Sequence, residues 1–256
     1  MLLATWNVNS IRAREERLLA WLEHRCPDVV CLQELKCTEE QFPYDAITAA
    51  GYQAAVHGQK TYNGVAILAK SPIEDVSTGF GDGGDESQAR VISGTVEDTR
   101  IISVYVVNGK SIDSDKYALK LEWLDRLERF VARQDLAAPL AICGDYNIVP
   151  DERDVEKKEA WEGGVLYNED LSTRFQRLLD IGLVDTFRRH HQEGGLYSWW
   201  DYRMLGFPKN NGLRIDHVLA TPALADTSTD AYIDRDQRKG QKPSDHAPVL
   251  AEFGLG

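Results

Sequence analysis

Short apolar runs alternate along the chain with longer amphipathic stretches, and several of the runs end in polar residues. The runs are typical of buried strands, which we expect at residues 2–6, 28–33, 64–68, 91–96, 100–106, 140–143, 216–220 and 247–253. The amphipathic stretches predict helices over 11–22, 117–134 and 172–179, the last of them ended by Gly182. Strands that alternate with helices favour an α/β fold in which the helices lie outside the sheets.

The length allows one large domain or two small ones, and the composition is that of a soluble globular protein; we expect a single domain over residues 1–256. The sequence contains no internal repeat, low-complexity tract or Ser/Gly-rich linker. No apolar run reaches the roughly 18 residues that a membrane-spanning helix needs, and the N-terminus has no signal-peptide pattern. We therefore expect a cytoplasmic monomer without a membrane partner, nucleoid-associated if the host is a prokaryote.

The four cysteines, Cys26, Cys31, Cys37 and Cys143, form no Cys-x-x-Cys pair. Without a secretory signal they are interpreted as free, mostly buried thiols in a reducing compartment. Their spacing fits none of the usual zinc patterns, which argues against a structural zinc site.

The formal net charge is −12 and the sequence pI is near 5.0. This counts against nucleic-acid binding, because DNA-binding proteins usually carry a basic face. Two alternatives remain open. The chain is either an enzyme with a small-molecule substrate, or a DNA enzyme whose carboxylates gather around a cation while lysines and arginines line one rim.

Polar residues stand directly after two of the expected strands. Asn7 follows the strand at 2–6, where its amide could serve a cation or an anion, form a turn, or cap the next helix. Glu34 follows the strand at 28–33, and a carboxylate at the edge of a core is costly unless it is paired or binds a metal. A metal site and a salt bridge to Lys36 or an arginine are both compatible with this pattern.

The strand at 140–143 is followed by Gly144, which lets the backbone turn sharply, and then by Asp145 and Asn147. Because these two residues are two positions apart, their side chains point the same way in extended backbone. A carboxylate beside an amide suits a general base with an orienting partner, although the same residues are also typical of a type I turn.

Asp216 begins another expected strand, and Asp245 and His246 precede the last one. An imidazole near carboxylates can stay protonated near neutral pH and donate to a phosphate oxygen; a capped loop is the alternative. Together the five clusters supply carboxylates, amides and a histidine but no cysteine ligand, which fits Mg²⁺ or Mn²⁺ rather than structural zinc. A hard cation with one base and one phosphate-directed histidine predicts phosphoester hydrolysis.

These five clusters, in this order and over nearly the whole chain, resemble the exonuclease III family of apurinic/apyrimidinic endonucleases, within the endonuclease/exonuclease/phosphatase superfamily. The segments at 58–66, 103–109, 116–123 and 197–203 agree with the resemblance. The last of them is similar to the segment that separates the DNA enzymes from the inositol phosphatases and sphingomyelinases. The resemblance implies a four-layer α/β sandwich, with two face-to-face mixed β-sheets flanked by helices.

The resemblance also implies a metal-dependent hydrolase of double-stranded DNA in base-excision repair. Such an enzyme cleaves 5′ to abasic sites and processes damaged 3′ ends as a 3′→5′ exonuclease and 3′-phosphatase. Because residues 167–173 depart from the family's usual run, an enzyme that mainly cleans 3′ ends is the alternative. Two remoter alternatives are another superfamily enzyme, such as an inositol phosphatase or an RNA deadenylase, and a non-catalytic RNA-binding regulator with the same fold.

Metal ligands follow from the resemblance, position by position. Glu34 is similar to the family's main metal ligand, Asn7 lies beside it, and Asp245 resembles a further acidic residue near the metal. The full set of metal ligands that the resemblance implies is Asn7, Glu34, Asp145, Asn147, Asp245 and His246.

Catalytic roles follow in the same way. Asp145 resembles the residue that positions or deprotonates the attacking water, and Asn147 resembles the amide that orients it. His246 resembles the phosphate-binding histidine, and Asp216 resembles the carboxylate that orients this histidine. Tyr105 resembles the tyrosine whose hydroxyl reaches the phosphate or the leaving group.

Contacts to DNA are expected at cationic and aromatic positions. The candidate phosphate contacts are Lys60, Arg90, Lys116, Lys120 and Arg203. Trp199 resembles the aromatic residue that lines the family's pocket for a flipped-out, base-less sugar. The loop at 204–207 is apolar, so it either wedges into the base stack or packs on the protein body.

Overall fold

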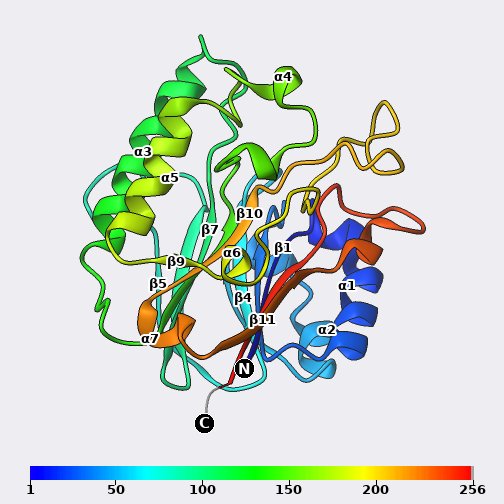
Figure 1. Cartoon of the computed structure of the whole chain (residues 1–256). Helices are drawn as coiled ribbons and strands as arrows, with labels where there is room; N and C mark the ends of the chain where they lie inside the picture. The colour runs from blue at the N-terminus through cyan, green and yellow to red at the C-terminus, as the bar shows by residue number, and fades with distance from the viewer. Residues whose placement is uncertain (255–256) are drawn as a thin grey trace.

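Two six-stranded β-sheets face each other in the computed structural model, which describes residues 1–254 (Figure 1). The first sheet has the strand order β11 (Ser228–Ile233), β12 (Val249–Phe253), β1 (Leu2–Asn7), β2 (Val29–Gln33), β4 (Val65–Ala69) and β3 (Gln53–His57). The second has the order β5 (Ile73–Thr78), β6 (Val91–Val96), β7 (Thr99–Tyr105), β8 (Leu140–Asp145), β10 (Asp216–Ala220) and β9 (Val184–Asp185). Both sheets are mixed, since β1–β2 and β7–β8 are parallel and the other pairs are antiparallel. The last two residues of the domain expected over 1–256 lie outside the described residues, and a single domain remains a prediction.

The central strands are apolar on both faces because both faces are covered. In β1, Leu3 points into the core between the sheets, whereas Ala4 and Trp6 point to the outer side. In β7, Ile101 points inward and Ile102 outward in the same alternation. This period of two is the geometry of extended backbone, and it explains why such strands are continuous apolar runs in the sequence.

Helices cover the outer face of each sheet, which confirms the four-layer sandwich (Figure 1). The first sheet packs against α1 (Ile11–Arg25) and α2 (Tyr44–Ala49), and the second against α3 (Asp115–Val131) and α5 (Glu169–Asp180). The shorter helical pieces are η1 (Glu39–Gln41), η2 (Glu152–Asp154), α4 (Lys158–Trp161), α6 (Thr186–His190), α7 (Pro222–Ala225) and η3 (Arg235–Arg238). No helix within residues 1–254 has the length and apolar character needed to cross a membrane.

The long helices begin at side-chain caps. Ser114 accepts a hydrogen bond from the backbone N–H of Tyr117 at the start of α3, and Asn168 accepts one from Leu171 at the start of α5. Both helices therefore begin two or three residues before the apolar periodicity that predicted them. The same caps place the segments that precede α3 and α5 next to each other, because the Asn168 amide also donates to the Tyr117 hydroxyl at 2.8 Å.

The parallel pairs bring four polar residues to one edge of the sandwich. Asn7 ends β1, Glu34 directly follows β2, Tyr105 ends β7 and Asp145 ends β8. In addition, β10 begins at this edge, with Asp216 directly opposite Asp145 in the antiparallel register. The candidate chemistry therefore gathers where the central strands of both sheets end.

Candidate active site

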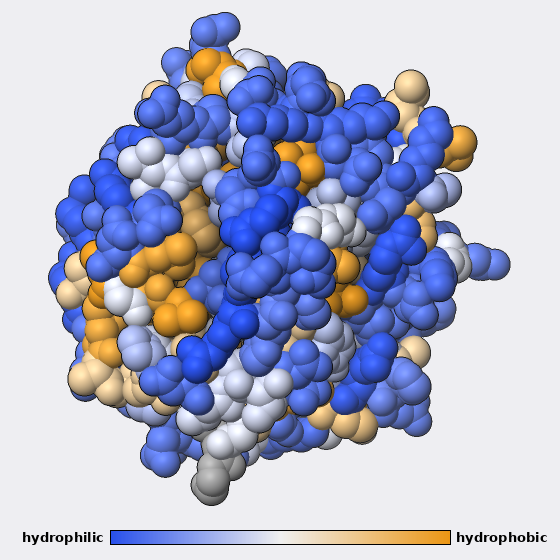
Figure 2. All heavy atoms as spheres, in the orientation of Figure 1, coloured by the Kyte–Doolittle hydropathy of each residue, from blue (hydrophilic) through white to orange (hydrophobic). Residues whose placement is uncertain are grey.

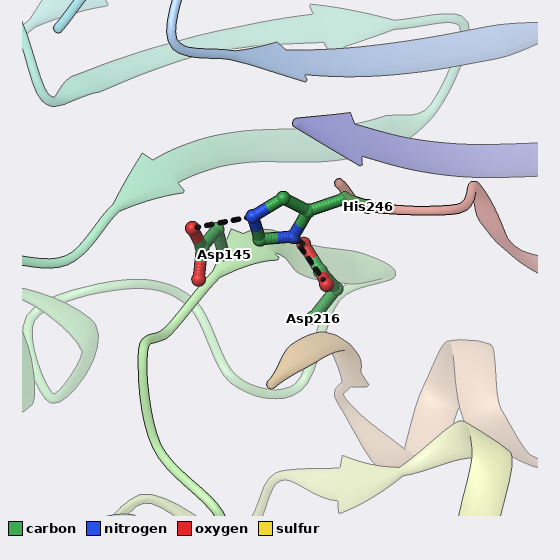
Figure 3. A group of neighbouring side chains, drawn as sticks. All are labelled: Asp145, Asp216 and His246. Carbon is green, nitrogen blue, oxygen red and sulfur yellow. Dashed lines mark hydrogen bonds and ion pairs between the residues drawn. The ribbon is translucent and has the colours of Figure 1, made fainter. Parts of the chain in front are cut away.

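His246 lies between two buried carboxylates (Figure 3). Its Nδ1 is 2.9 Å from Oδ2 of Asp216, and its Nε2 is 3.7 Å from Oδ2 of Asp145. Burial favours the neutral ring, but the charges of Asp216 and Asp145 outweigh it and raise the pKa of His246 to about 10. The imidazole is therefore a cation at neutral pH, held in place by a carboxylate on each side.

Asp145 is held by two donors that fix its orientation. Its Oδ2 accepts a hydrogen bond from the Asn7 amide at 3.0 Å, and its Oδ1 accepts one from the backbone N–H of Asn147 at 2.9 Å. Burial raises the pKa of Asp145 to about 7, although the positive charge of His246 acts in the opposite direction. A carboxylate that exchanges its proton near neutral pH is suited to act as a general base.

Glu34 is surrounded by donors on both carboxylate oxygens. Oε1 accepts hydrogen bonds from the Asn7 amide at 3.0 Å and from the Tyr105 hydroxyl at 2.7 Å. Oε2 forms an ion pair with Lys36 at 2.8 Å. Burial would raise the pKa of Glu34, but Lys36 and the two hydrogen bonds outweigh it and lower the pKa. The salt bridge to Lys36 that the sequence suggested is therefore present. Glu34 carries a negative charge that attracts cations.

Tyr105 keeps its proton in this environment. Burial, together with the charges of Glu34 and Asp145, raises its pKa well above the usual value. Arg90 stacks on the phenol ring, with its guanidinium carbon 4.7 Å from the ring centre, and donates to the Tyr105 carbonyl at 3.0 Å. The hydroxyl is therefore a fixed donor at the edge of the Glu34 cluster.

The side chain of Asn147 does not lie where its spacing from Asp145 predicted. The backbone of Asn147 is in the left-handed region, with φ of 50°, so the two side chains do not point the same way. The Asn147 amide donates to the carbonyl of Val106 at 3.1 Å and accepts from the Asn108 amide at 2.9 Å. The backbone N–H of Asn147, not its side-chain amide, orients Asp145.

Asp245 contacts neighbours on the other side of the site. Its Oδ1 accepts from the Asn9 amide at 2.9 Å, and its Oδ2 accepts from the Trp199 indole N–H at 3.0 Å. Burial alone would raise the pKa of Asp245, but the charge of His246 and these two donors lower it. Asp245 therefore fixes the ring that is expected to line the sugar pocket.

The donors of the site suit a hard cation. Within residues 1–254, ligand atoms of Asp145, Asp216 and His246 lie within 4.8 Å of one another, but both carboxylates are already engaged by the imidazolium. Glu34 is the carboxylate that remains partly open, with 18% of its side chain exposed. Since the neighbours of Glu34 are an amide, a phenol and an ammonium, with no thiolate, the set fits Mg²⁺ or Mn²⁺ better than structural zinc.

Four of the five candidate phosphate contacts are accessible to DNA and one is not. Lys60, Lys116 and Arg203 are exposed, and Arg90 with Lys116 lines a cleft of about 720 Å³ that reaches Tyr105. Lys120 is completely buried, and its ammonium donates to three backbone carbonyls. The expectation that Lys120 contacts a phosphate is wrong, because its side chain crosses the core instead of reaching the surface.

The apolar loop at 204–207 projects from the body of the protein. Met204 and Leu205 are 83% and 63% exposed, whereas Phe207 packs edge-on against Trp200 with ring centres 5.3 Å apart. The loop is the gold segment at the upper right of Figure 1, and Figure 2 shows apolar surface at its tip. Packing of the whole loop on the protein body, one of the two expectations, is therefore not observed.

Several residues of the site carried no recognisable pattern in the sequence. Ser198 donates to Oδ2 of Asp216 at 2.6 Å from 18 positions away, and Ser244 donates to the Asn7 carbonyl at 2.7 Å. The Ser244 hydroxyl also accepts from the backbone N–H of His246 at 3.2 Å. A serine has no periodicity or charge that marks such a role, so only the fold reveals it.

The chain shares both its sequence and its fold with known nucleases. A model of the Endonuclease/Exonuclease/phosphatase family matches residues 4–246. Exodeoxyribonuclease III of Haemophilus influenzae is 36% identical over 262 residues, which cover 97% of this chain and 98% of that protein. Among solved structures, a 3′ phosphatase from Neisseria bound to a product DNA hairpin is 41% identical, with a TM-score of 0.97. An AP endonuclease from Archaeoglobus fulgidus is 36% identical, also with a TM-score of 0.97, and each of the two similarities covers 100% of both chains. The chain therefore belongs to the endonuclease/exonuclease/phosphatase family and, within it, to the exonuclease III family.

Proposed function

We propose that the chain hydrolyses phosphodiester bonds of double-stranded DNA with Mg²⁺ or Mn²⁺, incising 5′ to abasic sites and removing damaged 3′ ends. Its family makes it a hydrolytic nuclease. The observation that carries the proposal is the buried His246 cation between Asp145 and Asp216, next to the Glu34 carboxylate. This arrangement offers one base and one phosphate-directed cation within a few ångströms of each other.

In the inferred reaction, Asp145 accepts a proton from a water molecule while the water oxygen forms a bond to phosphorus. The bond between phosphorus and the 3′-oxygen breaks and this oxygen takes a proton from solvent water, which leaves a 3′-hydroxyl on one strand segment and a 5′-phosphate on the other. His246 donates from Nε2 to a phosphate oxygen, and Asp216 on Nδ1 keeps the ring charged. The protonated Tyr105 hydroxyl is a second donor for the phosphate or the departing oxygen.

Glu34, with Asn7 beside it, would hold the divalent cation. The lowered pKa of Glu34 supports this assignment, because it keeps the carboxylate charged; a bound cation would take the place of the Lys36 ammonium, which lies 2.8 Å from Oε2. When bound, Mg²⁺ or Mn²⁺ supplies positive charge that offsets the extra negative charge gained by the phosphate during hydrolysis.

The surface around the site supports a duplex substrate. Lys60, Lys116 and Arg203 offer exposed positive charge, and the projecting Met204 and Leu205 could wedge between bases. We also infer a monomer, because one chain supplies every residue of the proposed site.

A preference for 3′ ends over internal abasic sites is the second candidate. One observation favours it: Trp161 packs edge-on against Trp199, with ring centres 5.7 Å apart, and covers part of the ring expected to line the sugar pocket. A flipped-out sugar would then have to displace Trp161, whereas a frayed 3′ end could reach His246 from outside.

The test is cleavage of a duplex oligonucleotide that carries one abasic-site analogue, with Mg²⁺, with Mn²⁺ and with a chelator. We expect metal-dependent incision 5′ to the analogue, and no incision by the Glu34→Ala/His246→Ala control. Shortening from the 3′ end without incision would favour the second candidate. No metal-dependent cleavage of any DNA lesion or end would refute both.

A further inference from the structure

Lys120 is a buried lysine in a protein core, and burial lowers the pKa of its ammonium to about 7. It lies in the middle of α3 with none of its surface exposed, although lysine is rarely buried without a partner. Its ammonium donates three hydrogen bonds, and all three acceptors are backbone carbonyls. Since an ammonium has three donors and no acceptor, its hydrogen-bonding capacity is fully used.

The three carbonyls belong to three separate segments that lack regular secondary structure. Asn108, at 3.3 Å, lies between β7 and α3, and Asn147, at 2.7 Å, follows β8. Val165, at 2.5 Å, lies between α4 and α5. Backbone carbonyls in such segments have no hydrogen-bond partners in a sheet or helix. The Lys120 ammonium supplies hydrogen bonds to three of them.

A single residue, Asn147, links Lys120 to Asp145, the proposed general base. The carbonyl of Asn147 accepts from Lys120, and the backbone N–H of the same residue donates to Oδ1 of Asp145. The Asn108 amide also donates to the Asn147 side chain at 2.9 Å, so two of the three tied segments meet there. The left-handed backbone of Asn147 is an uncommon conformation for a residue with a side chain, and it persists only when its surroundings hold it.

We propose that Lys120 is a positioning residue for hydrolysis: its ammonium ties the segments of Asn108, Asn147 and Val165 together and thereby aims Asp145 at the attacking water. The inference rests on the proposed function. It assigns Lys120 an effect on the chemical step, in contrast to a phosphate contact, which would act on DNA binding. It also explains why a lysine is needed there, because no uncharged side chain presents three donors in three directions.

The test is steady-state cleavage of the abasic-site duplex by the Lys120→Met variant, which keeps the length of the side chain and removes all three donors. We expect kcat to fall about a hundredfold while KM stays within about twofold, because a misplaced base slows the chemistry without weakening DNA binding. Lys116→Ala, on the same helix but exposed, should instead raise KM and leave kcat nearly the same. Cleavage by the wild-type protein tests the proposed function separately from this inference.

A buried residue of the same helix controls for lost stability. Leu127→Ala removes part of the core beneath α3 but none of the three hydrogen bonds of Lys120, so it should lower the melting temperature but not kcat. If Lys120→Met does not fold, Lys120→Arg takes its place; its guanidinium keeps the charge but is larger and holds its donors in one plane, so it cannot reproduce the positions of the three ammonium hydrogen bonds and kcat should still fall about tenfold. An unchanged kcat with a raised KM, or an equal loss of kcat in Leu127→Ala, would overturn the proposal.

Discussion

Asp216→Asn should convert His246 from a cation into a neutral imidazole over most of the working pH range. The substitution keeps the size of the side chain but removes the negative charge 2.9 Å from Nδ1. Burial of His246 favours the neutral ring, and Asp216 is the largest influence that opposes burial. The pKa of His246 should therefore fall from about 10 toward the ordinary value near 6.5.

The size of the effect follows from this pKa. A tenfold change in the affinity of the ring for its proton corresponds to about 1.4 kcal/mol, so the surroundings favour the charged ring by about 5 kcal/mol at most. Loss of one preorganised donor to the reacting phosphate costs about 10²–10³ in kcat. At pH 8 a ring with a pKa near 6.5 is protonated in about one molecule in thirty, so we expect the Asp216→Asn variant to retain about 3% of the wild-type kcat.

The assay is the dependence of kcat on pH, from 6 to 10.5, for incision of the abasic-site duplex. The wild-type rate should fall only as pH approaches about 10, where His246 loses its proton. In Asp216→Asn the fall should begin near pH 7, whereas Ser198→Ala, which removes a neutral donor from Asp216, should keep the wild-type profile. If kcat of Asp216→Asn also falls only near pH 10, the role assigned to Asp216 and His246 is refuted.

Three further predictions concern stability and metal binding. Arg214→Leu should lower the free energy of unfolding by about 3–5 kcal/mol, because it leaves the buried Asp185 without its ion pair and leaves the buried Asp154 with Arg188 alone; urea unfolding measures this, and a loss below about 1 kcal/mol would contradict it. Glu34→Gln should abolish Mn²⁺ binding in calorimetry while the melting temperature stays within a few degrees, and wild-type affinity would exclude Glu34 as the main ligand. With a chelator present, the free energy of unfolding should decline more between about pH 6.5 and 10 in the wild type than in His246→Gln, because folded His246 binds its proton more tightly than the unfolded chain does, whereas Lys120 acts in the opposite direction in both proteins. Parallel profiles of the two proteins over that range would show that the His246 pKa is not raised.

The sequence predicted the centre of the fold better than its edges. Strands buried on both faces are continuous apolar runs, so β1, β2, β7 and β8 were expected close to their observed bounds. In contrast, β3, β5 and β11 lie at sheet edges, where most side chains of each strand are at least partly exposed. Their sequences lack an apolar run because their outer faces do not need one, and no pattern predicted them.

The site was predictable as a set of residues but not as a set of contacts. Asn7, Glu34 and Asp145 were expected together because each directly follows a strand, and the structure places them within hydrogen-bonding distance. The orientation of Asn147 was wrong because spacing arguments assume extended backbone, whereas this residue has a positive φ. The prediction that Lys120 contacts a phosphate was wrong because its burial depends on carbonyls that are distant in the sequence. Composition does not reveal such carbonyls.

Net charge was a poor guide because it counts charges that never face DNA. Asp154 and Asp185 lie inside the protein beside Arg214 and Arg188, so these two carboxylates contribute little repulsion at the surface. The cleft beside Tyr105 is lined by Arg90, Lys110 and Lys116, and no carboxylate is among the residues that line it. A phosphate entering this cleft meets a local excess of positive charge even though the whole chain carries −12. Since salt screens charges beyond about 10 Å, carboxylates on the far side of the protein have little effect on the potential that DNA encounters there.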